Sequence, residues 1–283
     1  MINQNLYKPT AILELLNRHG FTFRKRMGQN FLTAYDVAEK AAATVDKTCG
    51  VLEIGPGHGA LTAPLCEHAG KVVAAELDER LLNVLKETLA GYDNVRVILA
   101  DAMELDLTEL CREEFAGLTP CVCANLPYNI TTPMLTKLIS HGGFRTITVM
   151  VQKEVADRIG APAGCKAYGI LTVKLACWWR VAERFDVPAS AFQPRPKVDA
   201  AVLVMEPRPA EETPGEEEWR GLSRFVDAAF GQRRKTLANA LAGGWAANRG
   251  REATYAALAA MGFNENVRAE QLSPVELRRL HAR

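Results

Sequence analysis

Features that would place a protein in a membrane or outside the cell have no counterpart in this sequence of 283 residues. No stretch reaches the roughly 18 consecutive apolar residues that a membrane-spanning helix needs. The N-terminus also lacks the basic and then apolar pattern of a signal peptide. We therefore expect a cytoplasmic protein with no membrane partner.

Cysteine content and net charge exclude further classes. The seven cysteines form no C-x-x-C pair, which argues against a disulfide framework and against a zinc site, so no metal is expected. A net charge of +1 provides no general attraction for nucleic acids. We predict that RNA binding comes from two basic clusters, although such clusters can equally be solvated surface: Arg24, Lys25 and Arg26, and Arg233, Arg234 and Lys235, which open a predicted helix.

Length and composition predict one large α/β domain followed by a small helical one. With 48% apolar and 24% charged residues, the chain can bury a sizeable core. Apolar strands alternate with helices up to residue 207, an acidic stretch at 211–218 marks a linker, and four helical segments follow. We predict a catalytic domain at 1–207, with helices on both faces of a sheet, and a helical RNA-binding or ribosome-binding domain at 208–283. A monomer is expected.

A buried strand that runs into a glycine-rich loop organises the first domain. The strand at 51–54 ends in Gly55 and Gly57, and a helix is predicted to begin near residue 60. Glycine has no Cβ and tolerates a positive φ, so a nucleotide cofactor can lie against the main chain there. Glu76 ends the next apolar strand, where its carboxylate can accept both hydroxyls of a ribose. NAD, FAD and methyl-donor sites all share this spacing.

Two further strand ends distinguish between these cofactors. The strand at 94–100 delivers Asp101 to the sheet edge that holds Gly55 and Glu76, where a carboxylate can accept from an adenine amino group. The strand at 121–124 leads into the tetrapeptide Asn125-Leu-Pro-Tyr128. A nicotinamide-dependent dehydrogenase has no need of this tetrapeptide, and no catalytic His, Lys or Tyr-x-x-x-Lys arrangement lies near the strand ends. We therefore predict S-adenosylmethionine as the cofactor and an amino group as the methyl acceptor.

The tetrapeptide suits methylation of an exocyclic adenine amine, which is a poor nucleophile because its lone pair is delocalised into the ring. The side-chain oxygen of Asn125 and the carbonyl of Leu126 or Pro127 can hold the two N–H bonds and turn the lone pair toward the methyl donor. Tyr128 would stack on one face of the base and Phe192 on the other. Either ring could instead be ordinary core packing.

Six motifs occur in a fixed order: GQNFL at 28–32, EIGPG at 53–57, NLPYNI at 125–130, KAYG at 166–169, FQPRPKVD at 192–199 and QRRKT at 232–236. Together they resemble the KsgA family of bacterial 16S ribosomal RNA adenine dimethyltransferases, from about residue 20 to residue 280. The resemblance implies a class I methyltransferase with a Rossmann-like sheet. Such an enzyme dimethylates N6 of two adjacent adenines near the 3′ end of 16S ribosomal RNA, with the 30S subunit or its precursor as partner.

The same resemblance implies roles for individual residues. The cofactor would be contacted by Asn30 and Leu32, by Gly55 at its methionine part, by Glu76 at its ribose and by Asp101 at its adenine, and Asn125 would contact both cofactor and target. The C-terminal domain would dock on the ribosome. Ala238 stands where arginine is common in that family, a change that would weaken the second basic cluster.

Two alternatives share parts of this pattern. An antibiotic-resistance dimethyltransferase acting on 23S ribosomal RNA would have the same catalytic edge, although Asn129, Ile130 and the motif at 232–236 favour the small-subunit enzyme. A primarily non-catalytic ribosome-assembly factor could also retain an intact site.

Overall fold

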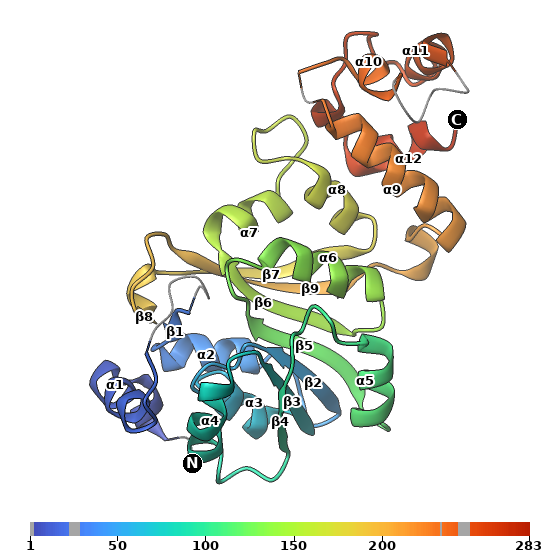
Figure 1. Cartoon of the computed structure of the whole chain (residues 1–283). Coiled ribbons are helices and arrows are strands. Elements are labelled where there is room, and N and C mark those ends of the chain that lie inside the picture. Colours follow the sequence, from blue (N-terminus) through green and yellow to red (C-terminus); the bar gives the residue numbers. More distant parts are fainter. Residues whose placement is uncertain (1–2, 23–28, 233, 243–249) are drawn as a thin grey trace. The chain divides into compact units, whose positions relative to one another are not determined.

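The computed structural model describes residues 3–22, 29–232, 234–242 and 250–283. Contacts within the chain divide it into two compact units. One consists of residues 1–156 and 181–207, and the other of residues 157–180 and 208–283. Figure 1 labels the elements of both units.

The first unit contains a seven-stranded sheet with the order β4-β3-β2-β5-β6-β9-β7. Its strands are β2 (Cys49–Ile54), β3 (Lys71–Glu76), β4 (Val95–Leu99), β5 (Thr119–Asn125), β6 (Thr146–Gln152), β7 (Trp179–Val187) and β9 (Ala200–Pro207). The pairs β2–β3, β3–β4, β2–β5 and β5–β6 are parallel, whereas β6 and β9 are antiparallel. A second sheet has two short antiparallel strands, β1 (Phe31–Leu32) and β8 (Phe192–Gln193).

Helices alternate with the strands of the large sheet. They are α1 (Pro9–Arg18), α2 (Tyr35–Ala42), α3 (Thr62–His68), α4 (Leu82–Thr88), α5 (Leu107–Glu114), α6 (Thr131–His141) and α7 (Lys153–Ile159), with 3-10 turns η1 (Gln4–Tyr7), η3 (Glu79–Leu81) and η4 (Ala189–Ala191). The inward residues of α1 to α4 form one buried cluster with alternate residues of β2, including Cys49 and Val51. Every residue of β2 is buried, as expected for a parallel strand covered on both faces.

The chain order reverses at β2, which has β3 and β4 on one side and β5 and β6 on the other. Because β2, β3, β4 and β5 are mutually parallel, their carboxyl ends meet at one edge of the sheet. In open α/β sheets such a reversal leaves a crevice beyond the strand ends, and ligands bind there. The residues after Ile54, Glu76, Leu99 and Asn125 are therefore placed to form a site.

The second unit is helical. It contains α8 (Ile170–Ala176), α9 (Glu216–Phe230), α10 (Leu237–Leu241), α11 (Gly250–Ala260) and α12 (Pro274–His281), with the 3-10 turns η5 (Ala210–Glu212) and η6 (Ala269–Gln271). Val173 of α8 packs in one core with Phe225 of α9 and Leu277 of α12. The buried hydroxyl of Tyr168 donates to the carbonyl of Leu272 at 2.7 Å.

One segment differs from the predicted division of the chain. Residues 157–180, which the sequence analysis placed in a domain at 1–207, group with the C-terminal helices because α8 buries its apolar side in their core. The catalytic and RNA-binding roles assigned to the two domains stay predictions.

Most strands that matter for the site occupy the residues predicted for them, since those predicted at 51–54, 94–100 and 121–124 correspond to β2, β4 and β5. The helix predicted to open at the second basic cluster is present as α10 but begins later than predicted: Arg234 and Lys235 lie in a turn, and α10 begins at Leu237 after an extended Thr236. Within the described ranges, no helix combines the length and the apolar character that crossing a membrane requires.

Candidate functional site

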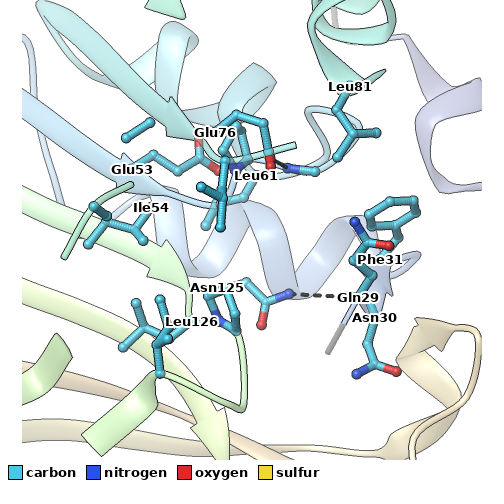
Figure 2. Close-up of a pocket in the computed structure, with 18 of the residues that line it drawn as sticks. Gln29, Asn30, Phe31, Glu53, Ile54, Leu61, Glu76, Leu81, Asn125 and Leu126 are labelled. Carbon is cyan, nitrogen blue, oxygen red and sulfur yellow. Dashed lines mark hydrogen bonds between the residues drawn. The ribbon is translucent and has the colours of Figure 1, made fainter. Parts of the chain in front are cut away.

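A cavity of about 280 Å³ opens at the edge of the sheet where β2, β3, β4 and β5 end (Figure 2). Its lining contains every residue predicted to bind the cofactor and the whole predicted target turn: Asn30, Leu32, Gly55, Gly57, Glu76, Asp101, Asn125, Leu126, Pro127 and Tyr128. The fold thus brings together residues from five separate segments. Four of these segments are the strand ends that the sequence analysis expected at one sheet edge, and the fifth, with Asn30 and Leu32, was expected from the family resemblance.

Two glycines bring the main chain close to neighbouring side chains at this edge. Gly55 has a φ of 69° and Gly57 a φ of 62°, values that residues with a side chain rarely adopt. A Cβ on Gly55 would lie 3.3 Å from Pro127, and one on Gly57 would lie 3.1 Å from the Phe31 ring. The loop therefore keeps its shape, and the cavity its floor, only while both positions carry no side chain.

Main-chain donors fix the carboxylate of Glu76, which is 6% exposed. The N–H of Gly57 donates to Oε2 at 3.3 Å, and the N–H of Asp78 donates to Oε1 at 2.8 Å. Burial raises the pKa of Glu76, and these hydrogen bonds oppose the rise. Each carboxylate oxygen keeps a further lone pair, so Glu76 can still accept from two ligand hydroxyls.

Glu53 lines the cavity from β2, and the sequence analysis gave it no role. It is 1% exposed, and its Oε2 has no hydrogen-bond partner among the described residues. Burial, together with the nearby Glu76 carboxylate, raises the pKa of Glu53 to about 8. At neutral pH the side chain is therefore a protonated acid. An acid inside an apolar strand is the signal that could have identified it.

Two buried hydrogen bonds hold the N-terminal turn η1 to the glycine loop. The hydroxyl of Tyr7 donates to the carbonyl of Ala60 at 2.8 Å, and Nε2 of His58 lies 2.8 Å from the carbonyl of Leu6. Burial lowers the pKa of His58 to about 4, so the ring is neutral at physiological pH. Its hydrogen is on Nε2, because a carbonyl can only accept. This support for the loop was missed by the sequence analysis.

Asp101 follows β4 and lines the cavity from a tight turn. Its Oδ1 accepts from the N–H of Met103 at 2.8 Å, and its carbonyl accepts from the N–H of Glu104 at 2.9 Å. Within the part of the chain that the structure describes, no donor contacts Oδ2, so this oxygen can accept from a ligand amino group.

The side chain of Asn125 is oriented by the main chain of the segment before β1. Its Nδ2 donates to the carbonyl of Asn30 at 3.3 Å, the dashed line in Figure 2. Because a carbonyl can only accept, the amide nitrogen faces Asn30 and Oδ1 is turned away from it. No donor of the described ranges contacts this oxygen, which is free to accept from a ligand.

The two carbonyls predicted to share the target differ in availability. The carbonyl of Pro127 accepts from the N–H of Ile130 at 3.1 Å and from the hydroxyl of Thr131 at 3.0 Å, so both of its lone pairs are used. Leu126 donates its N–H to Met150 at 3.0 Å, and its carbonyl accepts from no described residue. Leu126 therefore offers the unoccupied acceptor beside Asn125.

The two predicted stacking rings have different positions. Tyr128 lines the cavity, and its buried hydroxyl has no partner among the described residues. Phe192 is 3% exposed and packs in the hydrophobic core opposite Leu32 in the β1–β8 pair, and it does not appear among the described residues that line the cavity. Its contact with a base stays a prediction, and that contact would require the ring to leave the core.

Most of the basic residues predicted to bind RNA, Arg24, Lys25, Arg26 and Arg233, lie outside the described residues. Arg234 and Lys235 are exposed in the turn before α10. Ala238 is fully buried, and the expectation that an alanine at this position weakens the cluster stays a prediction. RNA binding by the clusters stays a prediction.

Comparison with known proteins adds independent findings. Residues 20–279 match the sequence model of the family described as ribosomal RNA adenine dimethylase. The chain is 40% identical over 285 residues to the ribosomal RNA small subunit methyltransferase A of Shouchella clausii, a match that covers 99% of this chain and 95% of that protein. It is 43% identical over 273 residues to the protein of the same name from Streptococcus gordonii, covering 94% and 93%.

Solved structures show the same arrangement. A dimethyladenosine transferase from Plasmodium falciparum superposes with a TM-score of 0.73 at 25% identity, covering 88% of this chain and 95% of that one. The 23S rRNA methyltransferase ErmE superposes with a TM-score of 0.71 at 26% identity, covering 89% and 98%. The sheet and its helices thus form a Rossmann-like methyltransferase fold.

Proposed function

The chain belongs to the ribosomal RNA adenine dimethylase family, and we propose that its cavity binds S-adenosylmethionine as the methyl donor. Membership of this family agrees with the predicted methyltransferase activity and gives no support to the alternative of a nicotinamide-dependent dehydrogenase. It leaves open which residues hold donor and target, and these assignments follow from the geometry of the cavity.

Two observations on this chain fit the proposed cofactor. The main chain at Gly55 and Gly57 carries no side chain beside Pro127 and Phe31, where a Cβ would lie 3.3 Å and 3.1 Å from these neighbours, which suits the close approach of a nucleoside and its amino-acid arm. The partnerless Oε2 of Glu53, buried at the cavity wall, suits a ligand that brings a hydrogen-bonding group to it.

We assign the parts of the cofactor to residues as follows. Glu76 accepts the ribose hydroxyls, since its carboxylate is already fixed by two main-chain donors and keeps free lone pairs. Asp101 accepts from the adenine amino group through Oδ2. Gly55 lies against the methionine part, and Asn30 and Leu32 cover the cofactor from the segment that ends in β1. When bound, the cofactor supplies a methyl group on a positively charged sulfur.

The Asn125 turn holds the target amine. Oδ1 of Asn125 and the carbonyl of Leu126 accept its two N–H bonds, which makes the nitrogen more tetrahedral and directs its lone pair toward the methyl group. The Asn30 carbonyl prevents the Asn125 amide from flipping and presenting donors instead of an acceptor. This locked orientation is the observation that carries the proposal.

The remaining steps need no dedicated base. Tyr128 stacks on the target base, a contact worth about 1 to 3 kcal/mol. Once the nitrogen has bonded to the methyl carbon and the carbon–sulfur bond has broken to leave a neutral thioether, the nitrogen is a cationic ammonium that gives its proton to water or to an accepting oxygen. Positioning accounts for most of the catalysis, because amine and methyl donor are held in contact.

We propose that the target is N6 of two adjacent adenines near the 3′ end of 16S ribosomal RNA, presented by the 30S subunit or its precursor. The support is that relatives of 40% and 43% identity over nearly the full chain are small subunit methyltransferases, whereas the 23S rRNA methyltransferase is 26% identical. Arg24, Lys25, Arg26, Arg233, Arg234 and Lys235 are proposed to contact RNA phosphates.

The test is transfer of labelled methyl groups from S-adenosylmethionine to purified unmethylated 30S subunits and, in parallel, to 23S ribosomal RNA. We expect dimethyladenosine only in the small-subunit RNA, and label confined to 23S RNA would overturn the substrate assignment. The variant Glu76→Ala separates catalysis from assembly. If it lost methylation but retained particle binding and maturation, the assembly role would be the primary one.

A further inference from the structure

Lys137 lies on α6 and makes an unusual set of contacts. Its Nζ donates to the carbonyls of Ala102 at 3.1 Å, Met103 at 2.7 Å and Leu105 at 2.6 Å. A lysine ammonium has three N–H donors, so all three are used, and all three go to neutral main-chain oxygens of one short loop. Such hydrogen bonds from a charged donor are stronger than neutral ones.

This loop is the one that carries Asp101. Asp101 and Ala102 line the cavity, and the Asp101 side chain accepts from the N–H of Met103 within the same turn. Three carbonyl oxygens that converge on one point repel one another unless a cation lies between them. The conformation that presents Asp101 to the cavity therefore depends on the Lys137 ammonium.

The helix that carries Lys137 is also tied to the target side of the cavity. α6 begins at Thr131, whose hydroxyl donates to the carbonyl of Pro127 in the Asn125–Tyr128 turn. One helix thus contacts the turn assigned to the target base through its first residue and the Asp101 loop through Lys137.

We propose that Lys137 is a positioning residue that sets the recognition of the cofactor's adenine by holding the Asp101 loop. The inference rests on the proposed function, because it requires a cofactor whose 6-amino group meets Asp101. Without the ammonium the loop relaxes, Oδ2 of Asp101 no longer faces that amino group, and the site loses its preference for adenine over a 6-oxo base. Transfer itself is not altered, since Lys137 touches neither target nor methyl donor.

The experiment compares S-adenosylhomocysteine with S-inosylhomocysteine, in which a 6-oxo group replaces the 6-amino group and N1 carries a hydrogen, by isothermal titration calorimetry. The parent protein should prefer the adenosyl compound by at least about tenfold, the value of one hydrogen bond to a charged group. Lys137→Met should remove most of that preference, mainly by weakening the adenosyl compound. It should raise KM for S-adenosylmethionine and leave kcat at saturating cofactor nearly unchanged.

Lys47 provides a matched control. Its Nζ also donates to main-chain carbonyls, those of Cys66 at 3.2 Å and Ala69 at 3.1 Å, which do not belong to the cavity lining. Lys47→Met should cost similar thermal stability and leave the adenosyl preference intact. Lys137→Arg, which keeps the charge, should retain part of the preference.

The outcomes separate the two claims. If the parent binds neither analogue, the proposed function fails. If the parent prefers the adenosyl compound and Lys137→Met keeps that preference, or weakens both analogues by the same factor, the inference about Lys137 is wrong. A loss of preference in Lys47→Met as large as in Lys137→Met would also overturn it, because the effect would then follow from stability alone.

Discussion

Replacement of Glu53 by glutamine should change how the stability of the protein depends on pH. In the folded chain the pKa of Glu53 is raised to about 8 from an ordinary value of 4.5, first by burial and then by the Glu76 charge. Between these two values the folded state holds a proton that the unfolded state has lost. The free energy of unfolding contributed by Glu53 is therefore fully present below pH 4.5 and is lost as the pH rises toward 8.

The size of the effect follows from the same two pKa values. A difference of one bound proton changes the free energy of unfolding by about 1.4 kcal/mol per pH unit. Between pH 6 and pH 8, allowing for partial ionisation of the folded form near its pKa, Glu53 should lower the stability by about 2 kcal/mol. Glutamine has nearly the same shape and no charge, so Glu53→Gln should lack this loss.

Urea unfolding followed by circular dichroism at pH 6, 7 and 8 measures the difference directly. The free energy of unfolding of Glu53→Gln minus that of the parent should increase by about 2 kcal/mol across this range. Glu14→Gln, at an exposed position of α1, is the control and should show no trend. A difference that is constant with pH, or that decreases, would refute the assignment of a buried, protonated Glu53.

Four further predictions test the remaining parts of the site. Asn125→Ala should lower kcat at least about 100-fold while cofactor affinity changes little, and unchanged turnover would contradict its role. Gly57→Ala should weaken cofactor binding and cost about 1 to 2 kcal/mol in unfolding experiments, because φ is positive and the Cβ would meet Phe31. Since burial raises the pKa of Glu76, calorimetric cofactor affinity should fall as the pH drops through that pKa, and Glu76→Gln should abolish the trend. Charge reversal of Arg234 and Lys235 should reduce the slope of log affinity for RNA against log salt concentration by about 2. An unchanged slope would show that these two residues are solvated surface and contact no RNA phosphates.

The sequence was sufficient to predict the sheet edge. β2 is a continuous apolar strand that runs into glycines, so its burial and the positive φ of Gly55 and Gly57 follow from local chemistry. Glu76, Asp101 and Asn125 each end or follow a strand, and parallel strands necessarily bring such positions to one edge. These are short-range rules, and the cavity confirms their outcome.

Contacts between distant segments were beyond sequence reasoning. The hydrogen bond that orients Asn125 comes from the main chain of Asn30, which no pattern in the sequence connects with it. The lysine that binds the Asp101 loop lies on α6, where its spacing looks like that of any exposed helical lysine. The burial of Phe192 and Ala238 was also not evident from their proximity to motifs.

The boundary between the two units was also not predictable from the sequence, because it depends on contacts between distant segments. The helix α8 buries Val173 and Leu175, so it needs an apolar partner, and the sequence does not say whether that partner is the sheet or the C-terminal helices. In the structure its buried side packs with α9 and α12. Tertiary packing thus decided a division that composition alone had placed at residue 207.

The central claim is that Oδ1 of Asn125 and the carbonyl of Leu126 hold the amine that receives the methyl group. It is tested most directly by a crystal structure of the protein with S-adenosylhomocysteine and an adenine nucleotide. The account predicts that the sulfur faces the Asn125 turn and that N6 lies within hydrogen-bond distance of both oxygens. A sulfur that points away from this turn, or an N6 held by other groups, would contradict it.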